Sequence, residues 1–141
     1  MKWADERMLS ALPVQAQESM MVPLKHIYQG EAVWLRRILG EPGAQLGELE
    51  VASRDSLREL WLPVHQAWLE WAVSLTTEAD WARLVPHRNS RGDSFEMPAW
   101  QIMMHVVNHG SYHRGQVAMK LREAGSVPPA TDLIQYYRGP A

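Results

Sequence analysis

Residues 105–116 read HVVNHGSYHRGQ, and this stretch constrains the fold more than any other. Three of the chain's six histidines recur in it at intervals of four, as His105, His109 and His113. Residues four apart lie above one another on one face of an α-helix, so the spacing predicts a helix that carries a row of imidazoles. The row spans about 12 Å along the axis. No single metal ion can therefore contact all three rings, whereas two neighbouring rings can chelate one ion.

The row has two interpretations, a metal site or a set of buried, hydrogen-bonded imidazoles. A single histidine on an apolar helix face is more often a core residue than a ligand. Val106 and Val107 suggest partial burial, and burying several imidazoles without a metal or hydrogen-bond partners is costly. Gly110 stands where a His-Glu-x-x-His metalloprotease motif would place its general base, so that motif is excluded.

Four segments show the 3.6-residue period of amphipathic helices. They are residues 2–12, 19–39, 53–75 and 97–124. Ser19 can cap the second helix, Gly40 closes it, and Gly125 is a natural end for the fourth. Pro63 should kink the third helix or split it in two. The pattern predicts an all-α protein, an antiparallel four-helix bundle forming a single domain over Met1–Ala141.

The predicted helices are joined by segments rich in glycine, proline and polar residues. Residues 41–51 are expected to be a loop, and residues 76–96 a long connection between the third and fourth helices. Within that connection, residues 89–93 suit a small hairpin or an extended loop. The tail, residues 126–141, is broken by prolines but carries apolar side chains, so we expect it to dock on the body. These side chains are Leu133, Ile134, Tyr136 and Tyr137.

Composition limits the classes of function. The net charge of −2 provides no broad basic field, so nucleic acid and anionic membrane are poor candidate partners. The absence of cysteine excludes disulfides, thiolate metal sites and cysteine nucleophiles. No apolar run has the length of a membrane span, and residues 1–12 lack the continuous apolar core of a signal peptide. We therefore expect a soluble, cytoplasmic protein that acts on a small molecule.

A metal held by two neighbours of the histidine row needs a third ligand from another segment. His87 follows Pro86 and is interpreted as a surface turn residue. His65 lies two residues after Pro63 on a face shared with polar neighbours. His26 lies within the apolar stripe of the second helix, and an ion held between facing helices needs a ligand on that inner stripe. Bundle geometry therefore favours His26.

The sequence HVVNHGSYHRGQV resembles the signature of the DinB/YfiT-like proteins, bacterial four-helix bundles with a metal held by three histidines. The resemblance covers nearly the whole chain: KWADERMLSAL is similar to the family's first helix, PLKHIYQGEAVWLRRILG to its second and PPATDLIQYYR to its tail. It implies that His26, His109 and His113 are the metal ligands and that His105 is not. The chain departs from the family in a first helix that starts late and in Pro63.

The resemblance also implies a range of activities. Similar proteins include transferases that use a metal to activate a low-molecular-weight thiol, and others described as metal-dependent hydrolases. We expect one divalent transition metal ion, zinc, nickel or iron, since imidazole suits each of them. The catalytic residues are unknown. The alternative is a non-catalytic bundle that keeps the metal, or only the histidines, for stability.

Two residues after the row carry further expectations. Arg114 is offset by about 100° from His113 and is expected to pair with a carboxylate, Asp132 or Glu31. Gly115 interrupts a helix at a cost of about 1 kcal/mol, which predicts close approach of another backbone or a ligand.

The seven tryptophans predict the oligomeric state. Trp34 and Trp100 are expected to fill the inner core. Trp61, Trp68 and Trp71 then exceed what a small core holds, so some indole surface should be covered by a second subunit. A homodimer follows, as is common among the proteins that the chain resembles; the alternative is that the docked tail covers the surplus.

Overall fold

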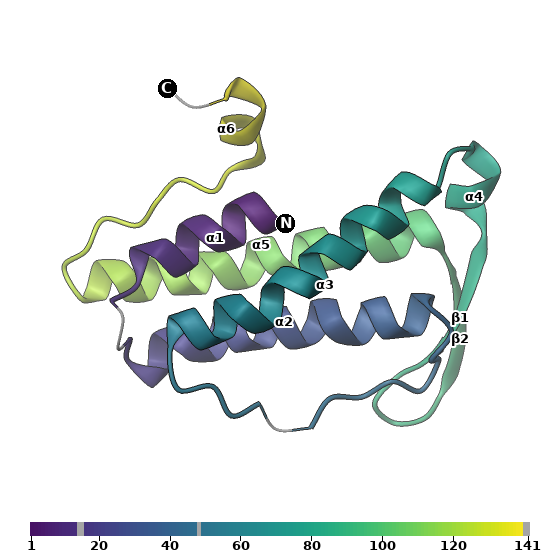
Figure 1. The fold of residues 1–141 in the computed structure, drawn as a ribbon, viewed down its shortest axis with the longest axis horizontal. Helices are drawn as coiled ribbons and strands as arrows, with labels where there is room; N and C mark the ends of the chain where they lie inside the picture. The colour runs from purple at the N-terminus through teal and green to yellow at the C-terminus, as the bar shows by residue number, and fades with distance from the viewer. Residues whose placement is uncertain (14–15, 48, 140–141) are drawn as a thin grey trace.

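The computed structural model describes residues 1–13, 16–47 and 49–139. Within these ranges the chain forms six helices and one two-stranded sheet (Figure 1). The elements are α1 (Lys2–Ala11), α2 (Glu18–Ile38), α3 (Arg54–Ser74), α4 (Glu78–Ala82), β1 (Leu84–Arg88), β2 (Ser94–Pro98), α5 (Ala99–Glu123) and α6 (Leu133–Arg138). The predicted loop and tail each include positions outside the described residues, namely Glu48 and residues 140–141.

The four helices α1, α2, α3 and α5 pack on one another around two buried apolar clusters (Figure 1). One cluster joins the first halves of α2 and α3, for example Leu24 and Trp61, to the last turns of α5. The other joins the second halves of α2 and α3 to the first turns of α5, for example Leu35, Trp68 and Ile102. The predicted helical fold is confirmed, but α2 and α3 run in the same direction, which differs from alternating antiparallel neighbours. The long connection 39–53 makes this possible because it returns the chain to the other end.

The limits of the long helices agree with the sequence signals at some ends and not at others. The side chain of Ser53 caps α3 by accepting a hydrogen bond from the Ser56 amide at 3.1 Å. Gly125 follows α5 with a φ of +78°, a left-handed conformation that suits glycine at a helix end. The helix α3 continues through Pro63, so the predicted split is wrong. Ser19 lies inside α2, whose N-cap is Gln17 without a side-chain hydrogen bond, so the predicted Ser19 cap is also wrong.

The connection between α3 and α5 contains the hairpin that the sequence suggested. Strands β1 and β2 pair antiparallel, with His87 opposite Phe95. Asn89 holds the turn with two hydrogen bonds. Its backbone N–H donates to the backbone carbonyl of Asp93 at 3.0 Å, and its side-chain Oδ1 accepts from the backbone N–H of Asp93 at 3.0 Å. The hairpin leads directly into α5 and so positions the first turn of that helix.

The tail touches the body at few points. The Nε atom of Arg7 donates to the carbonyl of Ala130 at 3.1 Å, and the rings of Trp3 and Tyr136 lie 5.6 Å apart. The helix α6 buries none of its residues and stands away from the bundle beside the start of α1 (Figure 1). The predicted docking is therefore wrong for Leu133, Ile134 and Tyr137, which are exposed, whereas Tyr136 packs its ring against Trp3 and is otherwise exposed.

The core accommodates more tryptophan than predicted. Trp61, Trp68 and Trp71 are all buried within the one chain, whereas Trp100 is 47% exposed rather than in the inner core. The tryptophan argument for a second subunit thus loses its main support, and the homodimer stays a prediction.

In the described part of the chain, no helix is both long enough and apolar enough to cross a membrane.

Candidate metal centre

Three histidines from two helices meet on one side of the bundle. His26 comes from α2, while His109 and His113 lie one turn apart on α5. Their ring centroids form a nearly equilateral triangle, with separations of 4.5 Å, 4.6 Å and 4.9 Å. His26 is exposed and the two α5 histidines are half-buried, so the group is accessible from solvent.

The donor atoms of this group lie close together, and one pair has the spacing of two ligands on a tetrahedral ion. Each ring offers one nitrogen, and these nitrogens all lie within 4.8 Å of one another. The Nε2 atoms of His26 and His109 are 3.2 Å apart. Two ligands of a tetrahedral zinc ion, each about 2.0–2.1 Å from it, are separated by about 3.3 Å. Among the described residues this group has three members, which leaves room at an ion for an exogenous ligand.

Two neighbours orient the rings. The Nδ1 atom of His113 lies 2.7 Å from Oε1 of Gln116, a contact that leaves Nε2 free to bind a metal. A Cβ atom added at Gly30 of α2 would lie only 2.9 Å from Cε1 of His109, so the ring of His109 rests against bare backbone. The role of Gln116 can be read from the i,i+3 spacing in the sequence, whereas that of Gly30 depends on how α2 packs against α5.

The surroundings of His26 and His109 favour the neutral imidazole, which is the form that binds a cation. Burial lowers the pKa of His109 to about 4, with further contributions from the nearby histidines His113, His26 and His105. Burial and then His113 also lower the pKa of His26. An imidazole in its neutral form offers a lone pair to an ion, so these lowered pKa values favour metal binding.

The other histidines lie outside this group. The ring of His105 is 5.8 Å from that of His109 and packs edge-on against Trp34, so the exclusion of His105 from the ligand set stays a prediction that metal analysis can test. His87 lies in β1 and is buried against Trp34 and Phe95, so its interpretation as a surface turn residue is wrong. His65 is also buried, on the inner face of α3, and not on a polar face.

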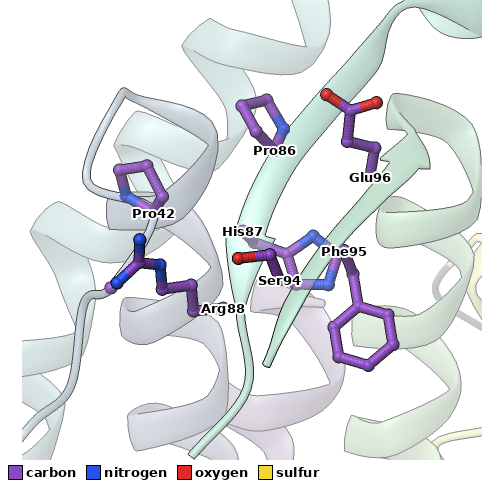
Figure 2. A pocket seen from close by; sticks show the side chains of 8 residues that line it. Pro42, Pro86, His87, Arg88, Ser94, Phe95 and Glu96 are labelled. Atoms are coloured by element: carbon purple, nitrogen blue, oxygen red, sulfur yellow. The ribbon is translucent and has the colours of Figure 1, made fainter. Parts of the chain in front are cut away.

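Two pockets differ in where they lie relative to the three histidines. A shallow one of about 260 Å³ borders the site and is lined by His26, Gly30 and Trp34 of α2 and by Leu46 of the connection to α3. A larger one, of about 620 Å³, lies between the hairpin and residues 42–43 (Figure 2). It contains none of the three clustered histidines. We regard the smaller pocket as the one relevant to chemistry because it shares His26 with the site.

A second group of ionisable residues is buried in the core. Asp5 of α1, Glu31 of α2, His65 of α3 and Arg114 of α5 are each at most 4% exposed. Nη1 of Arg114 donates to Oδ1 of Asp5 at 2.7 Å, and Nε2 of His65 lies 3.1 Å from Oδ2 of Asp5 and 3.4 Å from Oε2 of Glu31. Trp61 also donates to Oε2 of Glu31, at 2.7 Å. We call these four ionisable residues the buried charge cluster.

Asp5, Glu31 and His65 present three possible ligand atoms within 4.8 Å of one another, but the contacts favour an ion-pair network over a metal site. Donors already occupy both oxygens of Asp5 and Oε2 of Glu31, and with His65 protonated the four formal charges cancel. Burial raises the pKa of Glu31. Burial alone would lower the pKa of His65, but its contacts with Asp5 and Glu31 raise it. The pair formed by Glu31 and His65 therefore keeps its shared proton to a higher pH than either residue would alone.

The sequence did not predict this cluster. Arg114 pairs with a carboxylate as expected, but the partner is Asp5 and neither Asp132 nor Glu31. Gly115, expected to mark a close approach, faces open space. The close approach occurs at Gly110, where an added Cβ would lie 2.8 Å from Nη1 of Arg114.

Comparison with known proteins assigns the chain to a family. A sequence profile of the DinB family matches residues 5–140. Protein DinB of Bacillus subtilis (strain 168) is similar to the chain, with 25% identity over 121 residues that cover 80% of this chain and 69% of that protein. The profile match includes all three clustered histidines and all four residues of the buried charge cluster. The chain belongs to the DinB family.

Proposed function

We propose that the protein binds one divalent transition metal ion through His26, His109 and His113 and that it is a metal-dependent transferase or hydrolase. The observation that carries this proposal is the convergence of three imidazoles, with two Nε2 atoms 3.2 Å apart. The identity of the ion, zinc, nickel or iron, is left to measurement, since imidazole suits all three.

The residues around the site have distinct tasks in this proposal. Gln116 keeps Nε2 of His113 directed at the ion, and Gly30 leaves room for the ring of His109. The pocket beside His26 and Trp34 receives the substrate. A bound metal ion supplies Lewis acidity, which lowers the pKa of a thiol or water that binds beside the histidines. Since the chain has no cysteine, a transferase reaction takes its sulfur nucleophile from a low-molecular-weight thiol.

Metal analysis tests the binding part. Protein purified without a metal-affinity tag is expected to contain one metal ion per chain when measured by inductively coupled plasma mass spectrometry. His26→Ala and His109→Ala should abolish stoichiometric metal. His105→Ala is the matched control, because it removes an imidazole one turn away and should keep the metal. Loss of metal from the His105 variant as complete as from the other two would show that the ligand assignment is wrong.

The alternative is that the same three histidines hold a metal ion that only stabilises the fold. This alternative applies if no exogenous ligand can reach the ion. A structural site is closed by a fourth protein ligand, whereas a catalytic site keeps a position open. The cobalt(II)-substituted protein separates the two. Addition of 2-mercaptoethanol should produce a sulfur-to-cobalt charge-transfer band if a thiol can bind, and an unchanged spectrum would support the structural alternative.

A further inference from the structure

The histidine site and the buried charge cluster occupy adjacent positions along α5. His113 is followed by Arg114, and His109 by Gly110. The guanidinium of Arg114 lies against Gly110, since an added Cβ there would be 2.8 Å from Nη1. One turn of α5 thus directs two imidazoles toward α2 and, about 100° around the helix, directs one guanidinium into the core.

The same alternation occurs on α2. Gly30, which receives the ring of His109, is followed by Glu31 of the cluster. Both helices that carry the candidate ligands are therefore tied into the core at the positions next to the site.

We propose that the Asp5–Arg114 ion pair positions the three-histidine site by setting the rotation of α5 about its own axis. The inference rests on the proposed metal binding. The pair is 2.7 Å long between side chains that are 0% and 5% exposed. Apolar contacts between helices are non-directional, so they tolerate small rotations. A buried charged hydrogen bond does not, because rotation that breaks it leaves an unpaired ion in the core.

Asp5 is suited to the test because it lies on α1, which contributes no histidine to the site, and belongs to neither α2 nor α5. Asp5→Asn keeps the volume and one acceptor oxygen while removing the charge. Leu57→Ala is the control for general destabilisation, since Leu57 is fully buried on α3 in the same apolar cluster as α1 and takes no part in the charge cluster. Zinc affinity and the melting temperature of the metal-free protein are measured for both variants.

We expect Asp5→Asn to weaken zinc binding by about 10–100-fold, the usual effect of losing a group that orients metal ligands. Leu57→Ala should lower the melting temperature yet leave the zinc affinity at the wild-type value. Equal affinity losses in the two variants, or wild-type affinity in Asp5→Asn, would overturn the positioning role.

A second pair of variants keeps the inference testable if Asp5→Asn does not fold. Gly110→Ala displaces the guanidinium of Arg114 without removing a charge, and Gly115→Ala makes the same substitution on the same helix in open space. Zinc affinity should fall in the first variant and stay unchanged in the second. Unchanged affinity in both would contradict the inference.

A measurement without metal separates this inference from the proposed function. In the metal-free protein, long-range ¹H–¹⁵N spectra report which nitrogen of His109 and His113 carries the proton. Asp5→Asn should change these tautomer populations and Leu57→Ala should not. If the wild type binds no metal but Asp5→Asn shifts the tautomers, the proposed function fails and the positioning role stands. Unshifted tautomers in Asp5→Asn refute the positioning role whether or not metal binds.

Discussion

Substituting Gly30 with alanine should separate metal affinity from stability. The new Cβ would lie 2.9 Å from Cε1 and 3.2 Å from Nδ1 of His109. Non-bonded carbon atoms prefer about 3.5–4.0 Å, so the ring must retreat by about 0.6–1 Å. Metal–ligand distances tolerate only about 0.2 Å, so the displaced ring no longer shares an ion with the other two histidines.

The expected loss of affinity is about 10–100-fold, equivalent to about 1.4–2.7 kcal/mol of binding free energy. The same substitution favours the helix by about 1 kcal/mol, because glycine is the weaker helix former. The metal-free variant should therefore keep or exceed the wild-type melting temperature while binding zinc more weakly. A destabilised fold cannot explain such a combination.

Isothermal titration with zinc and thermal unfolding followed by circular dichroism provide the two measurements. Gly115→Ala is the matched control, since it gains the same helix propensity in open space. It should raise the melting temperature by about 2–4 °C per kcal/mol and leave zinc affinity unchanged. If Gly30→Ala binds zinc as tightly as Gly115→Ala does, the close contact with His109 does not control ligand geometry and the reasoning is refuted.

Four further predictions can be tested by measurement. Asp5→Ala leaves the buried Arg114 without its partner and should lower the free energy of unfolding, measured by urea titration, by about 3–5 kcal/mol. The control Glu41→Ala breaks an exposed ion pair with Arg36 and should lower it by less than about 1 kcal/mol. Similar losses in the two variants would contradict the burial argument. His65 has a raised pKa in the folded protein, so the stability that its protonated ring contributes is complete below its unfolded pKa of 6.5 and is lost as the pH rises through its folded pKa. The melting temperature of the metal-free protein should therefore fall above pH 6.5, and His65→Gln should make that fall smaller. His109, with a pKa lowered to about 4, has the opposite sign: stability should drop as the pH falls from 6.5 toward 4, and His109→Gln should reduce the drop. Light scattering in dilute solution should show a dimer, and a mass near the 16.1 kDa of one chain would refute the homodimer.

Much of the secondary structure could be predicted from the sequence because its signals are local. The end of α5 at Gly125 and the cap of α3 at Ser53 depend on residues within one turn of each helix end. The hairpin likewise follows from the turn chemistry around Asn89. The placement of His109 and His113 on one face needs only the helical period.

The third histidine required more than local information. The apolar stripe of α2 put His26 on the inner side of a bundle, and the resemblance to the DinB/YfiT-like proteins selected the same residue. The structure brings its Nε2 atom to 3.2 Å from that of His109. A periodic pattern identifies a face of each helix, but which faces meet depends on packing.

Only the tertiary structure decided the partners of the buried charges and the directions of the helices. Asp5 and Arg114 are 109 positions apart, and no spacing rule relates them. The sequence marked Gly115 as the glycine in close contact, whereas packing assigned that role to Gly30 and Gly110. The physical reason is that helix propensity, capping and periodicity act between residues a few positions apart. Contacts between helices depend instead on how each one is rotated and directed against its neighbours, which is set by the packing of the whole core.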